Sequence, residues 1–249
     1  MEHTINNRHQ VHNLIFLDES GSMESIREAI VSGFNEVIQT IKGCADQFPE
    51  QEHFISVITF NGLGIKTMFF NEQVEKLPVI DMEIYRPDAS TPLFDAMGRG
   101  INRLHAILTD NTDYDVLVTI LTDGEENASK EYSGKAIKRL VDQMKMENWT
   151  FAYIGTDHDV ESFAESISIN NVMRFGKDPE AMEAMFAKER KARFSYSQKM
   201  AMKEDVSKDF YKDDEPVTPA KTGVNPSTAA SVPPSAPANS RPWWKRIFG

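Results

Sequence analysis

Short apolar runs and longer stretches of helical periodicity alternate along residues 11–205. The run at 11–18 (VHNLIFLD) is almost continuously apolar, which is typical of a strand that is buried on both faces. Similar runs predict further strands at 54–60, 65–70, 116–121, 150–154 and 172–175. Apolar residues at helical spacing predict helices at 23–45, 93–108, 133–146, 160–168 and 179–201.

The order of these elements predicts an α/β fold with a Rossmann-like, doubly wound and mostly parallel sheet. The segment 61–64 (NGLG) is a turn signal short enough for a hairpin, so the strand that follows it should be an antiparallel edge strand. In such sheets ligands bind beyond the carboxyl ends of the strands. A binding site is therefore expected at that edge.

The composition changes after residue 205. Seven of the twelve prolines lie between Pro216 and Pro242, and no apolar periodicity accompanies them. Such a segment buries too little apolar surface to offset the entropy lost on ordering it. We therefore expect four parts: a polar leader at 1–10, a folded domain at 11–205, a disordered linker rich in proline, serine and alanine at 206–240, and a C-terminal motif at 241–249.

The C-terminal motif, RPWWKRIFG, combines aromatic and basic residues. At helical spacing its apolar side chains form one stripe, made of Trp243, Trp244, Ile247 and Phe248. The motif is interpreted as a short ligand for a second partner, as an anchor that makes a peripheral membrane protein, or as a segment that folds back on its own domain. We favour the ligand, because so short a segment with few cations anchors poorly to lipid.

Charge and cysteine content narrow the function classes. The net charge of −11 and the pI near 5.1 argue against nucleic acid as a partner. The single cysteine, Cys44, excludes an intramolecular disulfide and a zinc site built from cysteines. No apolar run is long enough to span a bilayer, and the first residues lack the basic and apolar regions of a secretory signal. We therefore expect a cytoplasmic protein.

Three short motifs fall at strand ends or just before a helix. Residues 18–22 (DESGS) match the pattern D-x-S-x-S and directly follow the first strand. Residues 90–93 (STPL) precede a helix, and residues 122–124 (TDG) follow the strand at 116–121. Because the carboxyl ends of parallel strands meet at one edge of a sheet, we expect the three motifs to lie together.

Together these motifs resemble those of the von Willebrand factor A (vWA) domain family, whose metal-ion-dependent adhesion site has this make-up in this chain order. The resemblance covers about residues 11–205, including the predicted order of strands and helices. It implies that a metal ion is held by three hydroxyls and, directly or through water, by two carboxylates: those of Ser20, Ser22, Thr91, Asp18 and Asp123. Within the family the chain looks most like the intracellular bacterial members, including those associated with tellurium and stress resistance.

The residue types agree with a site for a hard cation. Hydroxyl and carboxylate oxygens suit Mg²⁺, and also Mn²⁺ or Ca²⁺. Neutral hydroxyls and two carboxylates leave such an ion under-neutralised, so it attracts an external anionic oxygen at an open coordination position. An Asp or Glu side chain of a partner protein would supply that oxygen. We therefore expect an adaptor, scaffold or regulatory protein that binds its partner through a Mg²⁺ bridge.

Other interpretations of the same residues stay open. Asp18, Ser20 and Ser22 are suitable caps for the following helix, and Asp123 is an ordinary turn residue before Gly124. A Mg²⁺-dependent hydrolase or phosphotransfer enzyme is the alternative function. It is disfavoured because position 20 is a serine rather than a second acid, and no phosphate-binding loop or nucleophile elbow follows a strand. We therefore expect no catalytic residue and no organic cofactor.

Three histidines near the start of the chain, His3, His9 and His12, are metal ligands by residue type alone. They fall in the polar leader and at the start of the first strand, where we expect solvated or capping roles. Cys44 comes late in the first predicted helix and is expected to be a small core residue.

Overall fold

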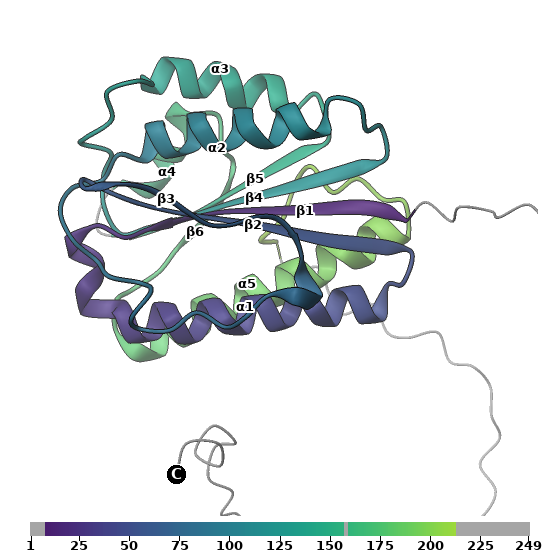
Figure 1. Cartoon of the computed structure of the whole chain (residues 1–249), viewed down its shortest axis with the longest axis horizontal. Coiled ribbons are helices and arrows are strands. Elements are labelled where there is room, and N and C mark those ends of the chain that lie inside the picture. The colour runs from purple at the N-terminus through teal and green to yellow at the C-terminus, as the bar shows by residue number, and fades with distance from the viewer. Residues whose placement is uncertain (1–7, 157–158, 213–249) are drawn as a thin grey trace, which may run out of the picture. The chain divides into compact units, whose positions relative to one another are not determined.

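The computed structural model describes residues 8–156 and 159–212, which form a six-stranded sheet between two layers of helices (Figure 1). The strands are β1 (His9–Asp18), β2 (Gln51–Asn61), β3 (Gly64–Gln73), β4 (Tyr114–Thr122), β5 (Trp149–Gly155) and β6 (Asn171–Arg174). The α-helices are α1 (Arg27–Gln47), α2 (Leu93–Leu108), α3 (Gly134–Met144), α4 (Val160–Ser166) and α5 (Pro179–Ala201), and the 3₁₀ helices are η1 (Gly21–Ile26) and η2 (Val74–Lys76).

The sheet has the strand order β3-β2-β1-β4-β5-β6. Neighbouring strands are parallel except for β2 and β3, which form the antiparallel hairpin at one edge. The chain therefore winds outward from β1 in both directions, and β1 and β4 lie at the centre. The predicted α/β fold with one antiparallel edge strand is confirmed.

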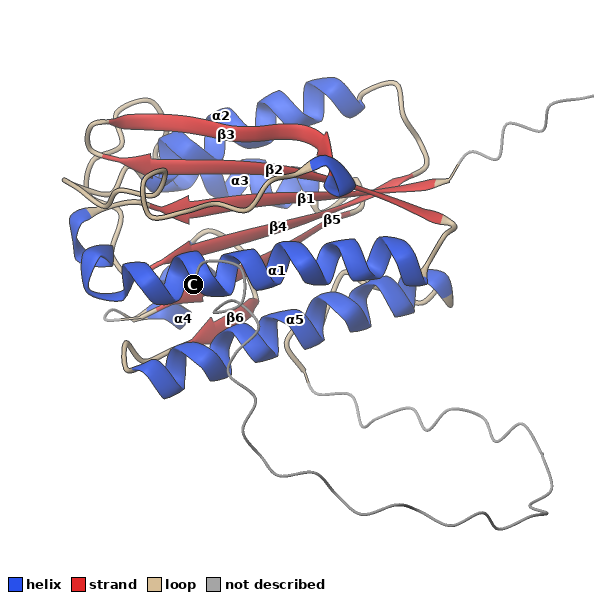
Figure 2. Ribbon diagram, turned by 60° about the horizontal axis from the view of Figure 1, so that its bottom comes forward, coloured by secondary structure: helices blue, strands red, loops and turns tan. Residues whose placement is uncertain are grey.

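Alternation of side chains along the strands divides the core between the two faces of the sheet. In β1, Ile15 and Leu17 pack in the cluster that includes α1 and α5. Leu14 and Phe16 point the other way, into the cluster that includes α2, α3 and α4. Figure 2 shows α1 and α5 side by side on their face of the sheet. Helices on both faces are the reason why β1 is buried at almost every position.

The element bounds differ from the predicted ones where other segments hold the chain. The helix predicted at 23–45 starts as the 3₁₀ helix η1, and α-helical structure begins only at Arg27. The loop before η1 is pinned by a distant segment, since the Gly21 N–H donates to the Ala89 carbonyl at 3.0 Å. This tertiary contact competes with a regular start of the helix. Local sequence patterns could not predict the contact, because Ala89 lies far from Gly21 along the chain.

The packed domain continues past residue 205, where the sequence analysis placed its end. Phe210 and Tyr211 are buried and belong to the core cluster of α1 and α5. The Tyr211 hydroxyl donates to Glu189 Oε2 at 2.7 Å, and Arg193 Nε donates to Glu189 Oε1 at 2.8 Å. Residues 206–211 therefore belong to the domain, because two buried aromatic side chains and the hydrogen bond from Tyr211 to Glu189 attach them to α5.

The C-terminal motif, with Trp243, Trp244, Ile247 and Phe248, lies outside the described residues, as does most of the predicted linker. Residues 1–7 of the polar leader lie outside them as well. The interpretations of these segments stay predictions. In the part of the chain that the structure describes, none of the helices combines the length and the apolar character needed to cross a bilayer.

Candidate metal centre

The three sequence motifs lie together at the carboxyl ends of β1 and β4. Asp18 is the last residue of β1, Asp123 directly follows β4, and Thr91 lies just before α2. Asp18, Ser20, Thr91 and Asp123 are buried, whereas Ser22 is exposed. The parallel sheet therefore brings two carboxylates and three hydroxyls from distant parts of the sequence to one edge.

Hydrogen bonds between side chains link the two serines to Asp123. Ser22 Oγ donates to Asp123 Oδ1 at 2.5 Å, and Ser20 Oγ lies 3.2 Å from Ser22 Oγ. Ser20 occupies the N-cap position of η1 without a side-chain cap bond, and α1 also begins without one. Helix capping by these side chains therefore does not explain the placement of the two hydroxyls: Ser22 Oγ contacts Asp123, and Ser20 Oγ contacts Ser22 Oγ.

Asp18 is a buried carboxylate with fixed orientation. Its Oδ1 accepts from the Ser20 N–H at 2.7 Å, and its Oδ2 accepts from Thr122 Oγ1 at 2.5 Å. The Tyr85 hydroxyl donates to the Asp18 carbonyl at 2.6 Å. Burial raises the pKa of Asp18 to about 6, against the lowering effect of the hydrogen bonds from Thr122 and Ser20. Protein dipoles therefore compensate its charge only in part, and a nearby cation would stabilise the ionised form.

The Thr91 hydroxyl approaches the same place from another loop. The Thr91 N–H donates to Asn127 Oδ1 at 2.9 Å, which ties the segment before α2 to the loop after β4. A Cβ placed on Gly124 would lie 3.4 Å from Thr91 Oγ1 and 3.7 Å from Ser22 Oγ. The two hydroxyls therefore border one space in front of Gly124, and glycine leaves that space open.

One carboxylate oxygen of Asp123 receives no hydrogen bond from the part of the chain that the structure describes. Its side chain is fully buried, and Oδ2 has no hydrogen-bond partner among the residues that the structure describes. Lys177 Nζ lies 2.9 Å from Oδ2, which makes an ion pair without the alignment of a hydrogen bond. A buried carboxylate oxygen in this state favours a cation beside it.

Two further acidic residues fix the loops around the site. Glu19 is buried, accepts from the Arg86 N–H at 2.6 Å and pairs with Lys66 Nζ at 3.2 Å. Glu126 accepts from the Phe94 N–H at 2.8 Å, in the first turn of α2. These bonds tie the loop before α2 to Glu19 and the loop after β4 to the first turn of α2, so that the Thr91 hydroxyl keeps its place relative to β4.

The sequence analysis missed several residues that contact the predicted ligands, among them Thr122, Tyr85 and Lys177. Thr122 belongs to the TDG motif, so its position next to Asp123 could have marked it as a residue of the site. Tyr85 and Lys177 lie far from the motifs in sequence, and no local pattern marks them. Only the folded arrangement of the loops brings these two side chains to the site.

The donor set fits a small, hard divalent cation. All of its side-chain ligands are oxygens, which Mg²⁺, Mn²⁺ and Ca²⁺ prefer. Over residues 8–156 and 159–212, no group of three or more His, Cys, Asp or Glu side chains is placed to hold a metal ion. The hydroxyls are therefore essential to any site here. Mg²⁺ takes about six oxygens, so these five side chains leave room for water or an outside ligand.

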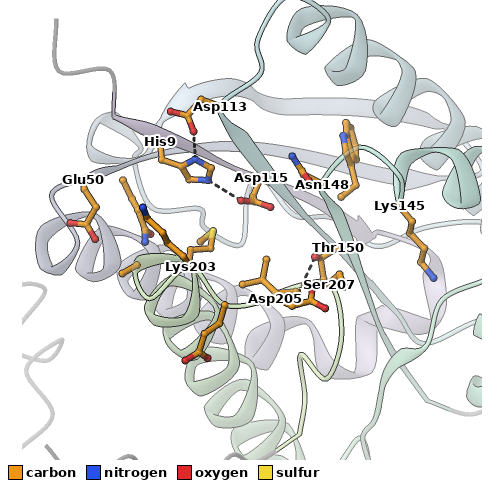
Figure 3. Close-up of a pocket in the computed structure, with 16 residues that line it drawn as sticks. His9, Glu50, Asp113, Asp115, Lys145, Asn148, Thr150, Lys203, Asp205 and Ser207 are labelled. Atoms are coloured by element: carbon orange, nitrogen blue, oxygen red, sulfur yellow. Dashed lines mark hydrogen bonds and ion pairs between the residues drawn. The ribbon is translucent and has the colours of Figure 1, made fainter. Parts of the chain in front are cut away.

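A separate cleft of about 760 Å³ lies at the amino-terminal ends of the strands (Figure 3). The His9 ring stands there between two acids, with Nδ1 2.7 Å from Asp113 Oδ1 and Nε2 2.9 Å from Asp115 Oδ2. The hydrogen bond with Asp115 contributes most to raising the pKa of His9. These acids already have a hydrogen-bonding partner from the protein itself, and this partner is a cation whenever the ring is protonated.

The other histidine of β1 differs from its prediction. His12 is buried and stacks on Phe54 with ring centroids 4.9 Å apart, so it is neither solvated nor a cap. Burial lowers the pKa of His12 to about 4, which keeps the ring neutral. Cys44 is buried in α1, as expected, and His3 lies outside the described residues.

No protein-family model matches the chain, and no curated protein sequence matches it. Solved structures do share its fold. The minor pilin PilB from Streptococcus sanguinis matches over 76% of this chain and 62% of its own, with a TM-score of 0.55 at 13% identity. The pilus adhesin SpaC from Lactobacillus rhamnosus GG matches over 76% of this chain and 30% of its own, with a TM-score of 0.55 at 15% identity.

The vWF domain of the type V pili tip protein Mfa5 from Porphyromonas gingivalis matches over 80% of this chain and 97% of its own, with a TM-score of 0.52 at 9% identity. The fold is vWA-like. At such low identity the likeness concerns the fold alone. The chain also spans less than two thirds of the pilin and of the adhesin, whereas it spans nearly the whole Mfa5 domain.

Proposed function

We propose that this chain is a protein-interaction domain that binds a divalent cation, with Mg²⁺ as the leading candidate, and uses it to bind an Asp or Glu of a partner protein. The ion would be held by two carboxylates and three hydroxyls, those of Asp18, Asp123, Ser20, Ser22 and Thr91. The observation that carries the proposal is the junction of Ser20, Ser22 and Asp123 in one hydrogen-bonded chain beside the buried Asp18.

The roles of the residues follow from their surroundings. Thr122 and the Ser20 N–H hold the Asp18 carboxylate in place, so it would bind the ion without a further loss of side-chain entropy. Ser22 is exposed, so the site is open to solvent on that side and accessible to a partner. The bound ion would supply the positive charge that attracts the partner's carboxylate. The protein needs no proton transfer for this role, and we propose no catalytic activity.

The comparisons support an interaction role through the names of the neighbours, which include a pilus tip protein and a pilus adhesin. Location is a further part of the proposal. On the resemblance to intracellular bacterial vWA proteins, we propose that this chain acts in the cytoplasm as an adaptor or regulatory subunit, in a stress-response setting. Cell fractionation tests the location, and recovery of the chain in a membrane or extracellular fraction would contradict it.

Metal binding tests the core of the proposal directly. Mn²⁺ serves as a paramagnetic probe, and the free ion is measured by electron paramagnetic resonance in the presence of wild type, Asp123→Ala and a control, Asp110→Ala. Asp110 is an exposed residue after α2, at the opposite end of the sheet. We expect one bound ion for wild type and the control, competition by Mg²⁺, and no binding by Asp123→Ala. Equal binding by all three proteins would place the ion elsewhere.

Partner binding is the second test. Tagged wild type, Asp123→Ala and Asp110→Ala are incubated with native lysate in Mg²⁺ or in EDTA. We expect a partner that is retained by wild type and Asp110→Ala in Mg²⁺ and lost in EDTA or with Asp123→Ala. A partner whose retention ignores both chelation and mutation would show that binding does not use the metal centre.

A further inference from the structure

Lys177 lies in the short connection between β6 and α5 and is fixed on both sides. Before it, the Phe175 N–H donates to the Gly155 carbonyl at 3.1 Å, and the Phe175 side chain is buried. After it, Asp178 caps α5 by accepting from the Ala181 N–H at 2.9 Å. The backbone at Lys177 is therefore held against the sheet edge. A change in the position of the ammonium would have to come from rotation of the side chain.

The Lys177 ammonium is the cation closest to the predicted ligand Asp123 in the described structure. Nζ lies 2.9 Å from Asp123 Oδ2, the oxygen that no hydrogen bond satisfies. The Asp123 side chain is fully buried, whereas the Lys177 side chain is 27% exposed. The ammonium therefore compensates a buried carboxylate, while the lysine side chain as a whole remains partly exposed to solvent.

A groove beside the site offers the Lys177 ammonium an alternative position. The groove measures about 460 Å³ and lies between the start of α1 and the start of α5. Lys177 lines it together with Arg27, Glu24 and Glu28; the two carboxylates are exposed, and Glu24 Oε1 lies 3.6 Å from Arg27 Nη1. If the Lys177 side chain turned away from Asp123, it would move toward solvent and these carboxylates, so its charge would stay compensated.

We propose that Lys177 is an internal cation that competes with the divalent ion for Asp123 and thereby sets the affinity of the metal centre. This inference rests on the proposed function. Without the ion, the ammonium compensates Asp123. When the ion binds, two positive charges face one carboxylate, so the ammonium must withdraw toward the groove. The cost of that withdrawal lowers the metal affinity, and a partner that presents a carboxylate would help to offset it by neutralising the ion.

The test compares metal affinities of the full chain with and without this charge. Lys177→Met removes the ammonium and keeps most of the apolar stem, Lys177→Arg keeps the charge, and Lys188→Met is the control on the exposed side of α5. We expect the dissociation constant for Mn²⁺ to fall about tenfold in Lys177→Met, as one partly screened charge removed at close range would produce. Lys177→Arg and Lys188→Met should stay near wild type.

Thermal stability supplies a second readout that a merely structural lysine would not produce. In EDTA, Lys177→Met leaves Asp123 buried without a cation, so its melting temperature should fall below that of wild type. Saturating Mg²⁺ should restore it, so the metal-induced rise is larger in the variant than in wild type. A lysine that only supports the loop would instead lower the melting temperature equally with and without the ion.

The outcomes separate this inference from the proposed function. If wild type binds Mn²⁺ in an Asp123-dependent way and Lys177→Met binds no more tightly, competition by Lys177 is wrong and the metal centre stands. If only Lys177→Met binds Mn²⁺, the competition is stronger than expected and the inference is supported. If neither protein binds the ion, the metal centre and the inference both fail.

Discussion

Acidic side chains lie at both ends of the central strands, but their negative charge is compensated differently at the two ends. At the carboxyl ends, Asp18 and Asp123 are buried and receive hydroxyl and backbone donors. At the amino ends, Asp113 is exposed, and His9 bridges it to Asp115. At the carboxyl ends, one ammonium, that of Lys177, faces two buried carboxylates, whereas at the amino ends His9 bridges two acids that are at least partly exposed to solvent.

This difference shows why an acidic cluster alone does not make a metal site. An exposed carboxylate is solvated, so pairing it with a histidine changes the free energy little. A buried carboxylate loses its hydration and depends on whatever dipoles and charges the fold provides. The carboxyl-end site meets this need with neutral hydroxyls and one ammonium, that of Lys177, which reduce the cost of burial but leave two carboxylates with a net negative charge for an ion.

The largest contrast is expected from removing one acid at each end. Asp18→Asn preserves shape but halves the carboxylate charge of the site, so Mn²⁺ affinity should fall at least about a hundredfold. Asp113→Asn should leave the affinity unchanged. Isothermal titration of the two variants beside wild type measures this. A similar loss in both variants would mean that the ion responds to overall charge and not to the carboxyl-end site.

The second contrast concerns the hydroxyl that supports Asp18. Thr122→Val keeps the β-branched shape but removes the donor to Asp18 Oδ2, so a buried charge loses a hydrogen bond. We expect the free energy of unfolding in EDTA to fall by about 1–3 kcal/mol, measured by urea denaturation. Thr67→Val, at an exposed position of β3, should change it by less than about 0.5 kcal/mol. Equal effects would show that Asp18 does not depend on this hydroxyl.

The smallest contrast is the pH dependence of the amino-end pair. The folded pKa of His9 lies above its ordinary value of 6.5. Its contribution to stability is therefore fully present below about pH 6.5 and is lost as the pH rises through the raised folded pKa. His9→Gln should lower the free energy of unfolding by about 0.5 kcal/mol near pH 6 and by less near pH 9.

Urea midpoints at the two pH values, with EDTA present, measure this loss. Identical losses would mean that His9 acts through neutral hydrogen bonds. Mg²⁺ should not alter the difference between the variant and wild type at either pH, since the pair lies at the far end of the strands. A Mg²⁺-dependent difference would contradict the separation of the two ends.

Much of the candidate site was predictable because the ligands follow a regular rule. Asp18 and Asp123 come directly after central parallel strands, and such strands end at one edge of a sheet. Thr91 directly precedes α2, which starts at the same edge and leads the chain back toward the amino end of β4. The end of the domain was less predictable, because Phe210 and Tyr211 follow charged and polar residues that resemble a linker. Their burial depends on packing against α5, which local sequence patterns do not show.

The sequence by itself determined the layers of the fold and the residue types at the sheet edge. Hydrophobic periodicity is local, so it specifies strands and helices, and chain order then restricts the topology. Only the tertiary structure decided which charged and polar groups meet: Lys177 beside Asp123, the Tyr85 hydroxyl on the Asp18 carbonyl, and His9 between its two acids. The physical reason is the short distance over which a buried charge is compensated. Electrostatic compensation of a buried group depends on atoms within a few ångströms, and those atoms come from segments far apart along the chain.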